Sequence, residues 1–158
     1  MSDLHLLLED QILTLRRYAF ALTRDIEQAD DLVEDTIIEA RRRPYLHGSD
    51  MRLRLLTILH EQRANPFRHA DPMAVHAGIV TDPAAQPTLS DLDRALGQLP
   101  EAQRAVILLI GLEGLSYGQT AAVLDISVGT MRSRLARGRE NLRRALGAAE
   151  EHEFGRAA

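Results

Sequence analysis

One stretch of the chain carries side chains suited to contacts with nucleic acid. Its sequence, TMRSRLARGR, holds polar residues that a helix would turn outward: Thr130, Arg132, Ser133, Arg134, Arg137 and Arg139. Arginine can donate two hydrogen bonds to a guanine or a phosphate, and the hydroxyls of serine and threonine bond phosphate oxygens or base edges. An Arg-rich helix face taken alone is usually only a solvated surface, so the interpretation depends on the elements around it.

Those elements predict a helix-turn-helix. Ser116 and Gln119 have capping-box spacing, so a short helix should begin at Tyr117 and turn Ala121, Ala122 and Leu124 inward. A turn at Asp125 and Ile126 follows, and Ser127 is a good N-cap for a longer helix. The apolar positions of that second helix share one face: Val128, Met131, Leu135, Leu142 and Leu146. Two helix starts, a turn and a polar face together favour DNA recognition.

Composition excludes several other classes of function. The 158 residues are 45% hydrophobic and hold no cysteine, which rules out disulfides and thiolate metal sites. The six histidines are scattered, and His69 and His76 stand in a Pro-rich stretch without carboxylate partners, so we expect no metal, no cofactor and no enzyme activity. No apolar run could span a bilayer, and Asp3 and Glu9 stand where a signal peptide would be positive, so we expect a cytoplasmic protein.

Charge is distributed unevenly along the chain. The net charge is −4, yet residues 92–147 hold eight Arg against five acids, while residues 1–70 hold ten Arg against twelve acids. Residues 71–91 hold three acids and no base. Positive charge therefore concentrates around the predicted helix-turn-helix, as DNA binding would require.

The amino-terminal half predicts three helices. Apolar residues at three-four spacing indicate a helix over about residues 4–23, and Asp25 with Gln28 caps a second helix that Pro44 ends. A third helix, capped by Ser49 or Asp50, should stop before residue 66. The outer face of the second helix is acidic, through Asp30, Asp31, Glu34, Asp35 and Glu39. That stripe indicates either solubility alone or a docking face for a basic partner.

The predicted fold is all-α, with two small helical domains joined by a Pro-rich linker. Residues 1–66 form the first domain, and residues 67–90 form the linker, because four of the six prolines lie between 66 and 90. Residues 91–147 form a four-helix domain that contains the helix-turn-helix, with its first helix capped by Ser90 and Leu92 facing inward. Residues 148–158 have no evident core face and should be a frayed tail.

The carboxyl-terminal domain resembles region four of bacterial sigma factors of the extracytoplasmic-function (ECF) group. The matching strings are ALGQLPE from Ala95, GLEGLSY from Gly111 and VGTMRSRL from Val128. The amino-terminal half resembles region two more loosely, through LRRYA from Leu15, ADDLVEDT from Ala29 and LLTIL from Leu55.

This resemblance implies a function in promoter-directed transcription. Region two would dock on the clamp of the largest subunit of RNA polymerase core through or beside Asp31, Leu32, Glu34, Asp35 and Ile38. Region four would dock on the flap of the second-largest subunit. Arg132, Ser133 and Arg137 would contact bases of the minus-35 promoter element, and Thr130 and Arg134 its backbone. The resemblance also implies an anti-sigma factor as a partner.

Region two departs from the family pattern. The family usually has a Trp where Arg54 stands, and its third helix continues into a segment with aromatics that opens the minus-10 element. Residues 51–64 hold no aromatic ring to stack on a flipped base, and Tyr45 and Phe67 are the candidates nearby. The alternative function is therefore a sigma-like regulator or mimic that binds an anti-sigma factor or polymerase without full initiation activity.

Overall fold

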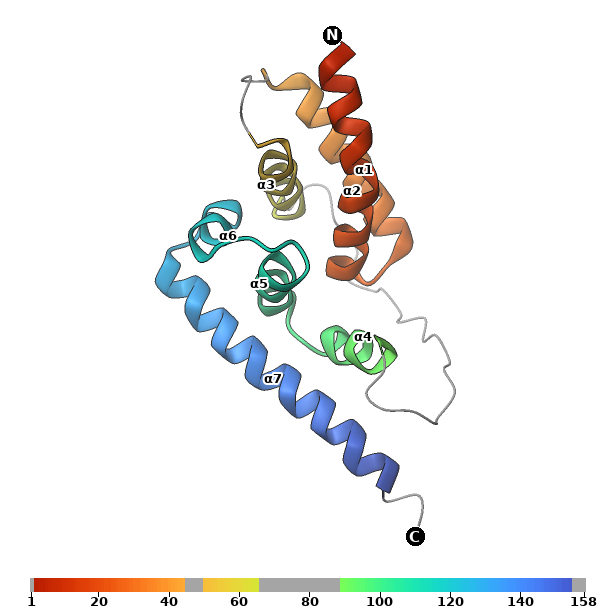
Figure 1. Cartoon of the computed structure of the whole chain (residues 1–158), viewed down its shortest axis with the longest axis vertical. Coiled ribbons are helices and arrows are strands. Elements are labelled where there is room, and N and C mark those ends of the chain that lie inside the picture. Colours follow the sequence, from red (N-terminus) through yellow and green to blue (C-terminus); the bar gives the residue numbers. More distant parts are fainter. Residues whose placement is uncertain (1, 45–49, 66–88, 155–158) are drawn as a thin grey trace.

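The computed structural model describes residues 2–44, 50–65 and 89–154. These residues form seven helices and no strand, as the all-α prediction required. The helices are α1 (Ser2–Thr23), α2 (Ile26–Arg42), α3 (Met51–Arg63), α4 (Leu89–Gly97), α5 (Glu101–Gly111), α6 (Tyr117–Val123) and α7 (Val128–Phe154). Figure 1 shows α1, α2 and α3 in the upper part of the molecule and α7 along its lower edge. The predicted linker and Tyr45, Phe67, His69 and His76 lie outside the described residues.

Local capping explains where most helices begin. The Asp25 carboxylate accepts a hydrogen bond from the backbone N–H of Gln28 at 2.8 Å, which starts α2. Asp50, rather than Ser49, caps α3 by accepting from the N–H groups of Arg52 and Leu53. Each cap satisfies backbone donors that a helix start leaves without partners, a contribution of roughly 0.5–2 kcal/mol.

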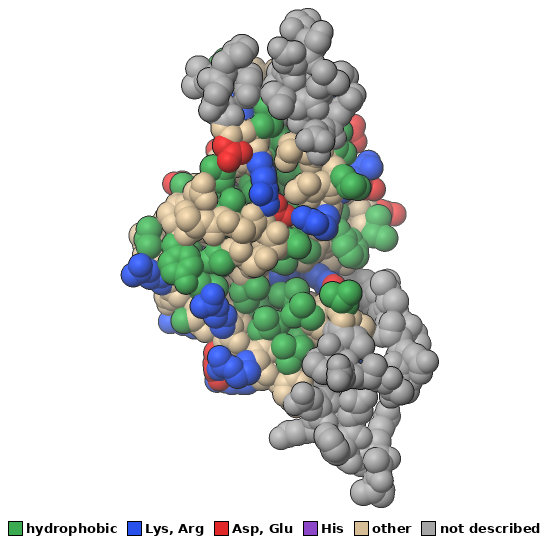
Figure 2. Space-filling model, viewed as in Figure 1, with side chains coloured by type: hydrophobic (Ala, Val, Ile, Leu, Met, Phe, Trp, Pro, Cys, Tyr) green, Lys and Arg blue, Asp and Glu red, His purple; other side chains and the backbone are tan. Residues whose placement is uncertain are grey.

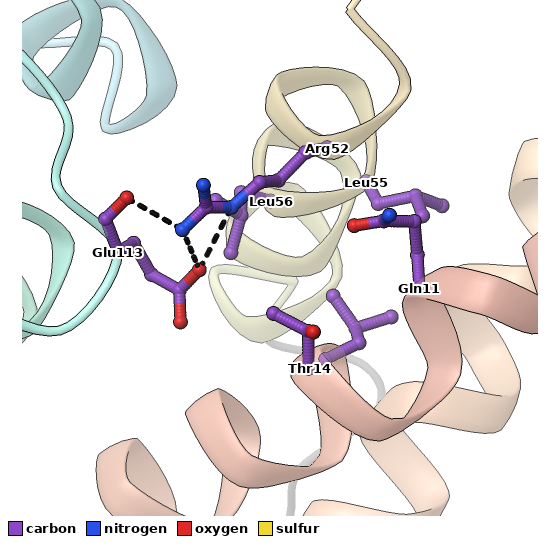
Figure 3. Close-up of a pocket in the computed structure, with 7 residues that line it drawn as sticks. Gln11, Thr14, Arg52, Leu55, Leu56 and Glu113 are labelled. Carbon is purple, nitrogen blue, oxygen red and sulfur yellow. Dashed lines mark hydrogen bonds and ion pairs between the residues drawn. The ribbon is translucent and has the colours of Figure 1, made fainter.

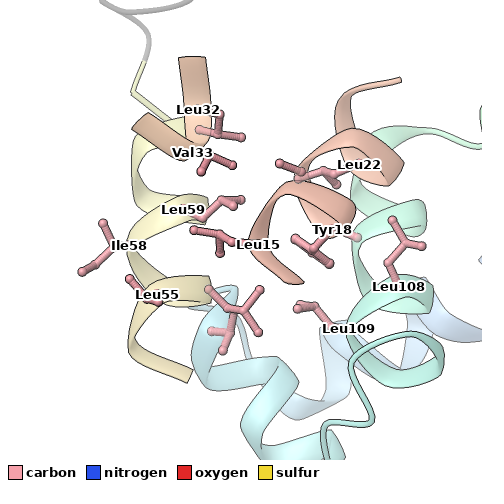
Figure 4. Close-up of a cluster of buried hydrophobic side chains, with 14 of the residues drawn as sticks. Leu15, Tyr18, Leu22, Leu32, Val33, Leu55, Ile58, Leu59, Leu108 and Leu109 are labelled. Carbon is pink, nitrogen blue, oxygen red and sulfur yellow. The ribbon is translucent and has the colours of Figure 1, made fainter. Parts of the chain in front are cut away.

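The amino-terminal half packs as a three-helix unit. Leu15, Tyr18 and Leu22 of α1 are buried together with Leu32 of α2 and Leu59 of α3. Figure 4 shows these side chains converging between the helices. The three-four spacing of apolar residues therefore predicted the buried face of α1 in the part whose side chains are described, while Ile26, which the same spacing assigned to the apolar face of α2, is exposed.

The carboxyl-terminal half is organised around α5. Met131 and Leu135 of α7 are buried against it, in a cluster with Val106. Gly138 permits the close approach of α7, since a Cβ there would lie 2.9 Å from the Cδ1 atom of Ile107. Asn141 adds a polar tie by donating to the Gln103 side chain at 2.8 Å.

The two halves share one continuous core in the structure. Leu108 and Leu109 of α5 belong to the same buried cluster as Leu15, Tyr18 and Leu22 of α1. In Figure 4, the two α5 leucines lie beside Tyr18 and Leu22. Helix α6 likewise contacts α3. The Pro-rich stretch predicted two domains, but it gave no indication that their apolar faces would close on each other.

Several local predictions were wrong. Helix α4 begins at Leu89, so Ser90 lies within its first turn, and Leu92 is exposed. Ala122 and Val128 are exposed as well, because nothing in the described part of the chain covers those ends of α6 and α7. Helix α7 continues to Phe154, past the expected end at Gly147, since Ala and Glu in the following residues favour helix and a single glycine costs only about 1 kcal/mol.

The interior of the amino-terminal half contains one polar pair. The Tyr18 hydroxyl donates to Nε2 of His60 at 2.7 Å, and the two rings meet edge to face. Burial lowers the pKa of His60 from 6.5 to about 4, so His60 is neutral at physiological pH. Burial, with the charges of Glu113 and Glu101 adding to it, raises the pKa of Tyr18, which keeps its hydroxyl protonated as a donor.

We predict that acidification destabilises the protein through His60. Between pH about 6.5 and about 4 the unfolded chain binds a proton at this histidine and the folded chain does not, so stability falls as pH falls through that window. The loss should reach ~2–3 kcal/mol. Urea unfolding at a series of pH values measures it.

The control for this prediction is His60→Gln, which can still accept the Tyr18 hydrogen bond but does not titrate. The variant should lose most of the pH dependence between 6.5 and 4. The fall that remains below pH about 4.5 comes from carboxylates such as Glu101, whose pKa is lowered. An equal slope in both proteins would show that His60 is not the titrating group.

Candidate nucleic-acid interface

The helix-turn-helix has the geometry that its sequence predicts. Ser116 accepts from the Gln119 N–H at 3.1 Å while the Gln119 side chain accepts from the Ser116 N–H at 3.0 Å, which completes the capping box of α6. Asp125 has a positive φ of 51° in the turn, a conformation that aspartate tolerates better than most residues. Ser127 then accepts from the Thr130 N–H at 3.0 Å and starts α7.

The start of α6 depends on a glycine. Gly114 has φ +66° between the end of α5 and the Ser116 cap, and the Leu115 N–H bonds back to the Leu109 carbonyl at 3.0 Å. A side chain at Gly114 would strain this backbone. The glycine therefore sets the angle at which the helix-turn-helix leaves α5.

The predicted DNA-contacting residues lie on one open face of α7. Thr130, Arg132, Ser133 and Arg137 are exposed, and Arg134 is half-buried. Figure 2 shows basic side chains gathered along the edge of the molecule that the first part of α7 forms. The opposite face of the helix holds Met131, which is completely buried. The division between a packed face and a polar face is therefore as the sequence predicted, except at Val128, which is exposed.

One of these arginines is supported by an aromatic ring. The Arg132 guanidinium carbon lies 5.8 Å from the ring centroid of Tyr117, a cation–π distance. Tyr117 is exposed at the start of α6. This contact links the two helices of the motif and restricts the positions that Arg132 can adopt before it meets a ligand.

Only some of the residues assigned to the polymerase-binding face of α2 are exposed to solvent. Asp31, Glu34 and Ile38 are exposed, and Asp35 is half-buried. Leu32 is completely buried in the core, and its place on or beside a polymerase-binding helix stays a prediction. It can support the surface only by packing beneath it.

Ion pairs join the two halves on either side of their apolar contact. Arg52 of α3 donates to Glu113 through Nε at 3.0 Å and Nη2 at 2.6 Å, and its Nη2 also donates to the Glu113 carbonyl at 2.5 Å. The Glu113 side chain has no exposed surface, and Figure 3 shows it meeting Arg52 beside a small pocket lined by residues of α1 and α3. The second Glu113 oxygen lies 3.7 Å from Arg17.

In two further ion pairs the amino-terminal half again supplies the arginine and the carboxyl-terminal half supplies the acid. Arg63 of α3 binds Glu101 of α5 through two hydrogen bonds, of 2.9 and 2.8 Å. Burial alone would raise the pKa of Glu101, but the bonds from Arg63 and the charge of Arg104 outweigh it and lower that pKa. Arg24 donates to the two carboxylate oxygens of Asp93 of α4 through its Nη1 and Nη2 atoms, which lowers the pKa of Asp93.

Arg104 is a buried cation whose hydrogen bonds, among the residues that the structure describes, all go to backbone carbonyls. Its guanidinium donates to the carbonyl oxygens of Leu22 at 2.5 Å, Leu96 at 3.0 Å and Leu99 at 2.9 Å. Burial lowers its pKa. Leu22 belongs to the last turn of α1, so this side chain ties the end of α1 to the segment between α4 and α5.

Sequence reasoning missed the residues of this contact between the halves. In the sequence pattern, these are ordinary charged residues: Arg52 and Glu113 are 61 positions apart, and the Leu22 carbonyl that Arg104 binds is 82 positions away. One feature of the sequence could have indicated this contact: Glu101 and Glu113 lie near the two ends of a strongly apolar helix.

The described part of the chain contains neither a candidate metal site nor a candidate membrane-spanning helix. Within residues 2–44, 50–65 and 89–154, no group of three or more His, Asp or Glu side chains could hold a metal ion. None of the helices described there is long and apolar enough to cross a membrane.

Comparison with protein families matches both halves. Residues 89–142 match the family model described as Sigma-70, region 4. Residues 8–60 match the model described as the Sigma2 domain of PhyR. The two matches correspond to the two halves that the structure brings together.

Individual relatives cover almost the whole chain. The ECF RNA polymerase sigma factor EcfG of Rhodopseudomonas palustris is 30% identical over 94% of this chain and 90% of its own length. The solved sigma factor RpoE of Bartonella quintana, in complex with the anti-sigma factor NepR, is also 30% identical, with a TM-score of 0.72 over 93% of this chain. The anti-anti-sigma factor PhyR of the same organism, complexed with NepR, shares the fold at 14% identity, with a TM-score of 0.59.

Proposed function

We propose, on the premise that this chain belongs to the ECF sigma factors of RNA polymerase, that α7 contacts the minus-35 promoter element while α2 binds the polymerase clamp. As a sigma factor the protein directs polymerase to promoters. The observation that carries the assignment of α7 is its exposed arginine and hydroxyl face on a correctly capped helix-turn-helix.

The chemistry of α7 suits base recognition in a major groove. Arg132 and Arg137 can each bond a guanine through two hydrogen bonds, and the small Ser133 between them lets the helix approach the base pairs. Thr130 at the amino end of α7 and the half-buried Arg134 would hold backbone phosphates. The cation–π contact with Tyr117 would reduce the entropy that Arg132 loses on binding.

The proposed polymerase surface is the exposed part of α2. Asp31 and Glu34 lie one turn apart, and Ile38 follows one turn later with 40% of its surface exposed. An acidic patch with an apolar residue at its edge suits a basic surface on the clamp, because opposite charges steer the encounter and a buried apolar contact holds it. Region four would bind the flap, and all of this would take place in the cytoplasm.

An anti-sigma factor is a further proposed partner. The sigma factor RpoE of Bartonella quintana forms a complex with NepR, and we extend that kind of partner to this chain.

A sigma mimic is the second candidate function, favoured by one observation. The amino-terminal half matches the Sigma2 domain of PhyR, and 46% of the length of an anti-anti-sigma factor shares the fold of 84% of this chain. The cationic face of α7 supports the first function instead, since a mimic that binds only an anti-sigma factor has no use for base-contacting arginines. Run-off transcription with purified core polymerase separates the two: transcription supports the sigma factor, and anti-sigma binding without transcription supports the mimic.

We predict that Arg132→Ala weakens binding to the preferred duplex by about 1–3 kcal/mol while changing nonspecific binding much less. Fluorescence anisotropy with cognate and scrambled duplexes measures both. Arg143→Ala is the matched control, because Arg143 is an exposed arginine of the same helix but pairs with Glu140. Equal losses on the two duplexes would remove Arg132 from base recognition.

Charge reversal on α2 should uncouple polymerase binding from DNA binding. We expect Glu34→Arg to lower the affinity for core polymerase at least about tenfold, since rim charges act on association and like charges repel. Asp35→Arg should act in the same direction but also disturb packing, because Asp35 is half-buried. Co-purification with core polymerase measures the effect, with Glu140→Arg on α7 as the control. Unchanged co-purification of Glu34→Arg would place the clamp contact elsewhere.

Promoter opening should be the weak step. Helix α3 ends at Arg63 and carries no Phe, Tyr or Trp, and its His60 ring is packed against Tyr18, so little in it can offset the few kcal/mol that unstacking a base costs. We expect poor transcription from relaxed linear duplex and much better transcription from a template with a pre-opened bubble or negative supercoiling. Tyr45 is the proposed stacking residue, and Tyr45→Ala should reduce opening further.

Permanganate footprinting measures opening directly. Strong thymine reactivity across the start site on relaxed linear DNA would show that this region two melts promoters unaided. A bubble template that is transcribed no better than linear duplex would point to the same conclusion.

A further inference from the structure

The arginines of α7 fall into two groups that a single acid separates. Residues 128–147 contain six arginines and one acid, Glu140. Four arginines precede it and pair with no carboxylate among the residues that the structure describes: Arg132, Arg134, Arg137 and Arg139. The two that follow it, Arg143 and Arg144, both pair with it. Glu140 therefore lies where the arginines of α7 change from open to paired.

The Glu140 carboxylate holds both of the arginines that follow it. Arg143 donates from Nη1 to Oε2 at 2.5 Å, and Arg144 donates from Nε to Oε1 at 3.3 Å, so each carboxylate oxygen has its own guanidinium. The side chains of Arg143 and Arg144 are 75% and 72% exposed, and that of Glu140 is 45% exposed. Ion pairs as exposed as these contribute little to stability, because water screens them. Their main effect is on the charge that this part of the helix presents to other molecules.

Helical periodicity places Glu140 on the face proposed for DNA. It follows Ser133 by seven residues, which is about two turns, so both residues lie on one side of α7 and are about 10 Å apart along the axis. Arg144 is four residues farther along the same side. The major groove of DNA is about 12 Å wide. When Ser133 lies at the base pairs, Glu140 therefore lies toward the phosphates that border the groove.

A carboxylate at this position limits the contact of α7 with DNA in two ways. It engages two guanidinium groups that would otherwise bind phosphates, and its own charge opposes the approach of the phosphate backbone. Binding to DNA of any sequence depends almost entirely on contacts between cations and phosphates, whereas a preferred site adds contacts to bases. A residue that removes phosphate contacts therefore acts mainly on nonspecific binding.

We propose that Glu140 is a specificity-determining residue of α7, which holds Arg143 and Arg144 away from phosphates and so lowers nonspecific binding more than binding to the preferred site. The proposal rests on the proposed function, in which the preceding residues of α7 contact bases. Those base contacts fix the helix along the groove, so the later turns reach few additional phosphates at the preferred site. On other sequences the helix is free to shift until unpaired arginines meet phosphates.

The test uses the full chain and two fluorescein-labelled duplexes, one that the protein selects from a random pool and one with the same bases in scrambled order. We expect Glu140→Gln to bind the scrambled duplex roughly fivefold more tightly at low salt. The slope of log affinity against log salt should steepen by up to about 1.8, because each phosphate neutralised on duplex DNA contributes about 0.9. Affinity for the selected duplex should rise by less than about twofold, so the ratio of the two affinities falls.

A matched control separates this effect from a change in net charge. Glu61→Gln removes the same charge from an acid of α3 that is 47% exposed and pairs with Arg43 at 2.7 Å. It therefore matches Glu140 in exposure and in having an arginine partner, but it belongs to the other half of the chain. We expect Glu61→Gln to change the affinity for either duplex by less than about twofold.

Removal of the two arginines identifies the groups that Glu140 holds. Arg143→Ala with Arg144→Ala should abolish the gain when added to Glu140→Gln, because the freed guanidinium groups are then absent. In the parent chain the same pair of substitutions should have a much smaller effect, since Glu140 already engages both arginines.

Three results overturn the proposal: no gain on the scrambled duplex, an equal gain on both duplexes, or a gain that survives the loss of Arg143 and Arg144. Arg132→Ala, measured on the same duplexes, keeps these results distinct from failure of the proposed function. If α7 does not contact bases, Arg132→Ala shows no selective loss on the selected duplex. If only the role of Glu140 is wrong, that selective loss remains.

Discussion

The apolar contact between α1 and α5 is the interaction on which the rest of this structure depends. Leu15, Tyr18 and Leu22 from one half and Leu108 and Leu109 from the other are all at most 5% exposed. Burying a leucine side chain contributes about 1.5–3 kcal/mol, while an ion pair at the edge contributes about 0–1 kcal/mol. The leucines and the tyrosine therefore hold the halves together, and the charged residues around them decide how the halves are oriented.

The orientation of the two halves is set by Arg104 and Glu113, two buried charged groups that need particular partners. Arg104 needs three carbonyl acceptors, and it finds one on α1 and two near the end of α4. Glu113 needs a cation because its side chain is fully buried. A shift of one half against the other would leave both groups without partners, at a cost of several kcal/mol for each ion. These contacts favour one closed arrangement over others more than they add to stability.

The sequence predicted the features that depend on residues close together in the chain, namely helix caps and helix faces. The N-caps at Asp25 and Ser116 and the outward face of α7 follow from local spacing, and the structure confirms them. The assignment of individual DNA and polymerase contacts remains a prediction, since it came from the family resemblance. Contacts such as Arg52 with Glu113 could not be predicted, because a periodic pattern identifies a buried face but not what covers it.

The contact between the halves and the contact that holds α7 use different sides of α5. Helix α5 turns its leucines toward α1 and its isoleucines toward α7, so packing on one side holds the amino-terminal half while packing on the other positions α7. Gly114 and the Ser116 cap fix α6 directly after Glu113, the residue that binds Arg52. The buried contact of Met131 with α5 includes no residue of the amino-terminal half, so the position of α7 on α5 does not depend on the pairing of Arg52 with Glu113.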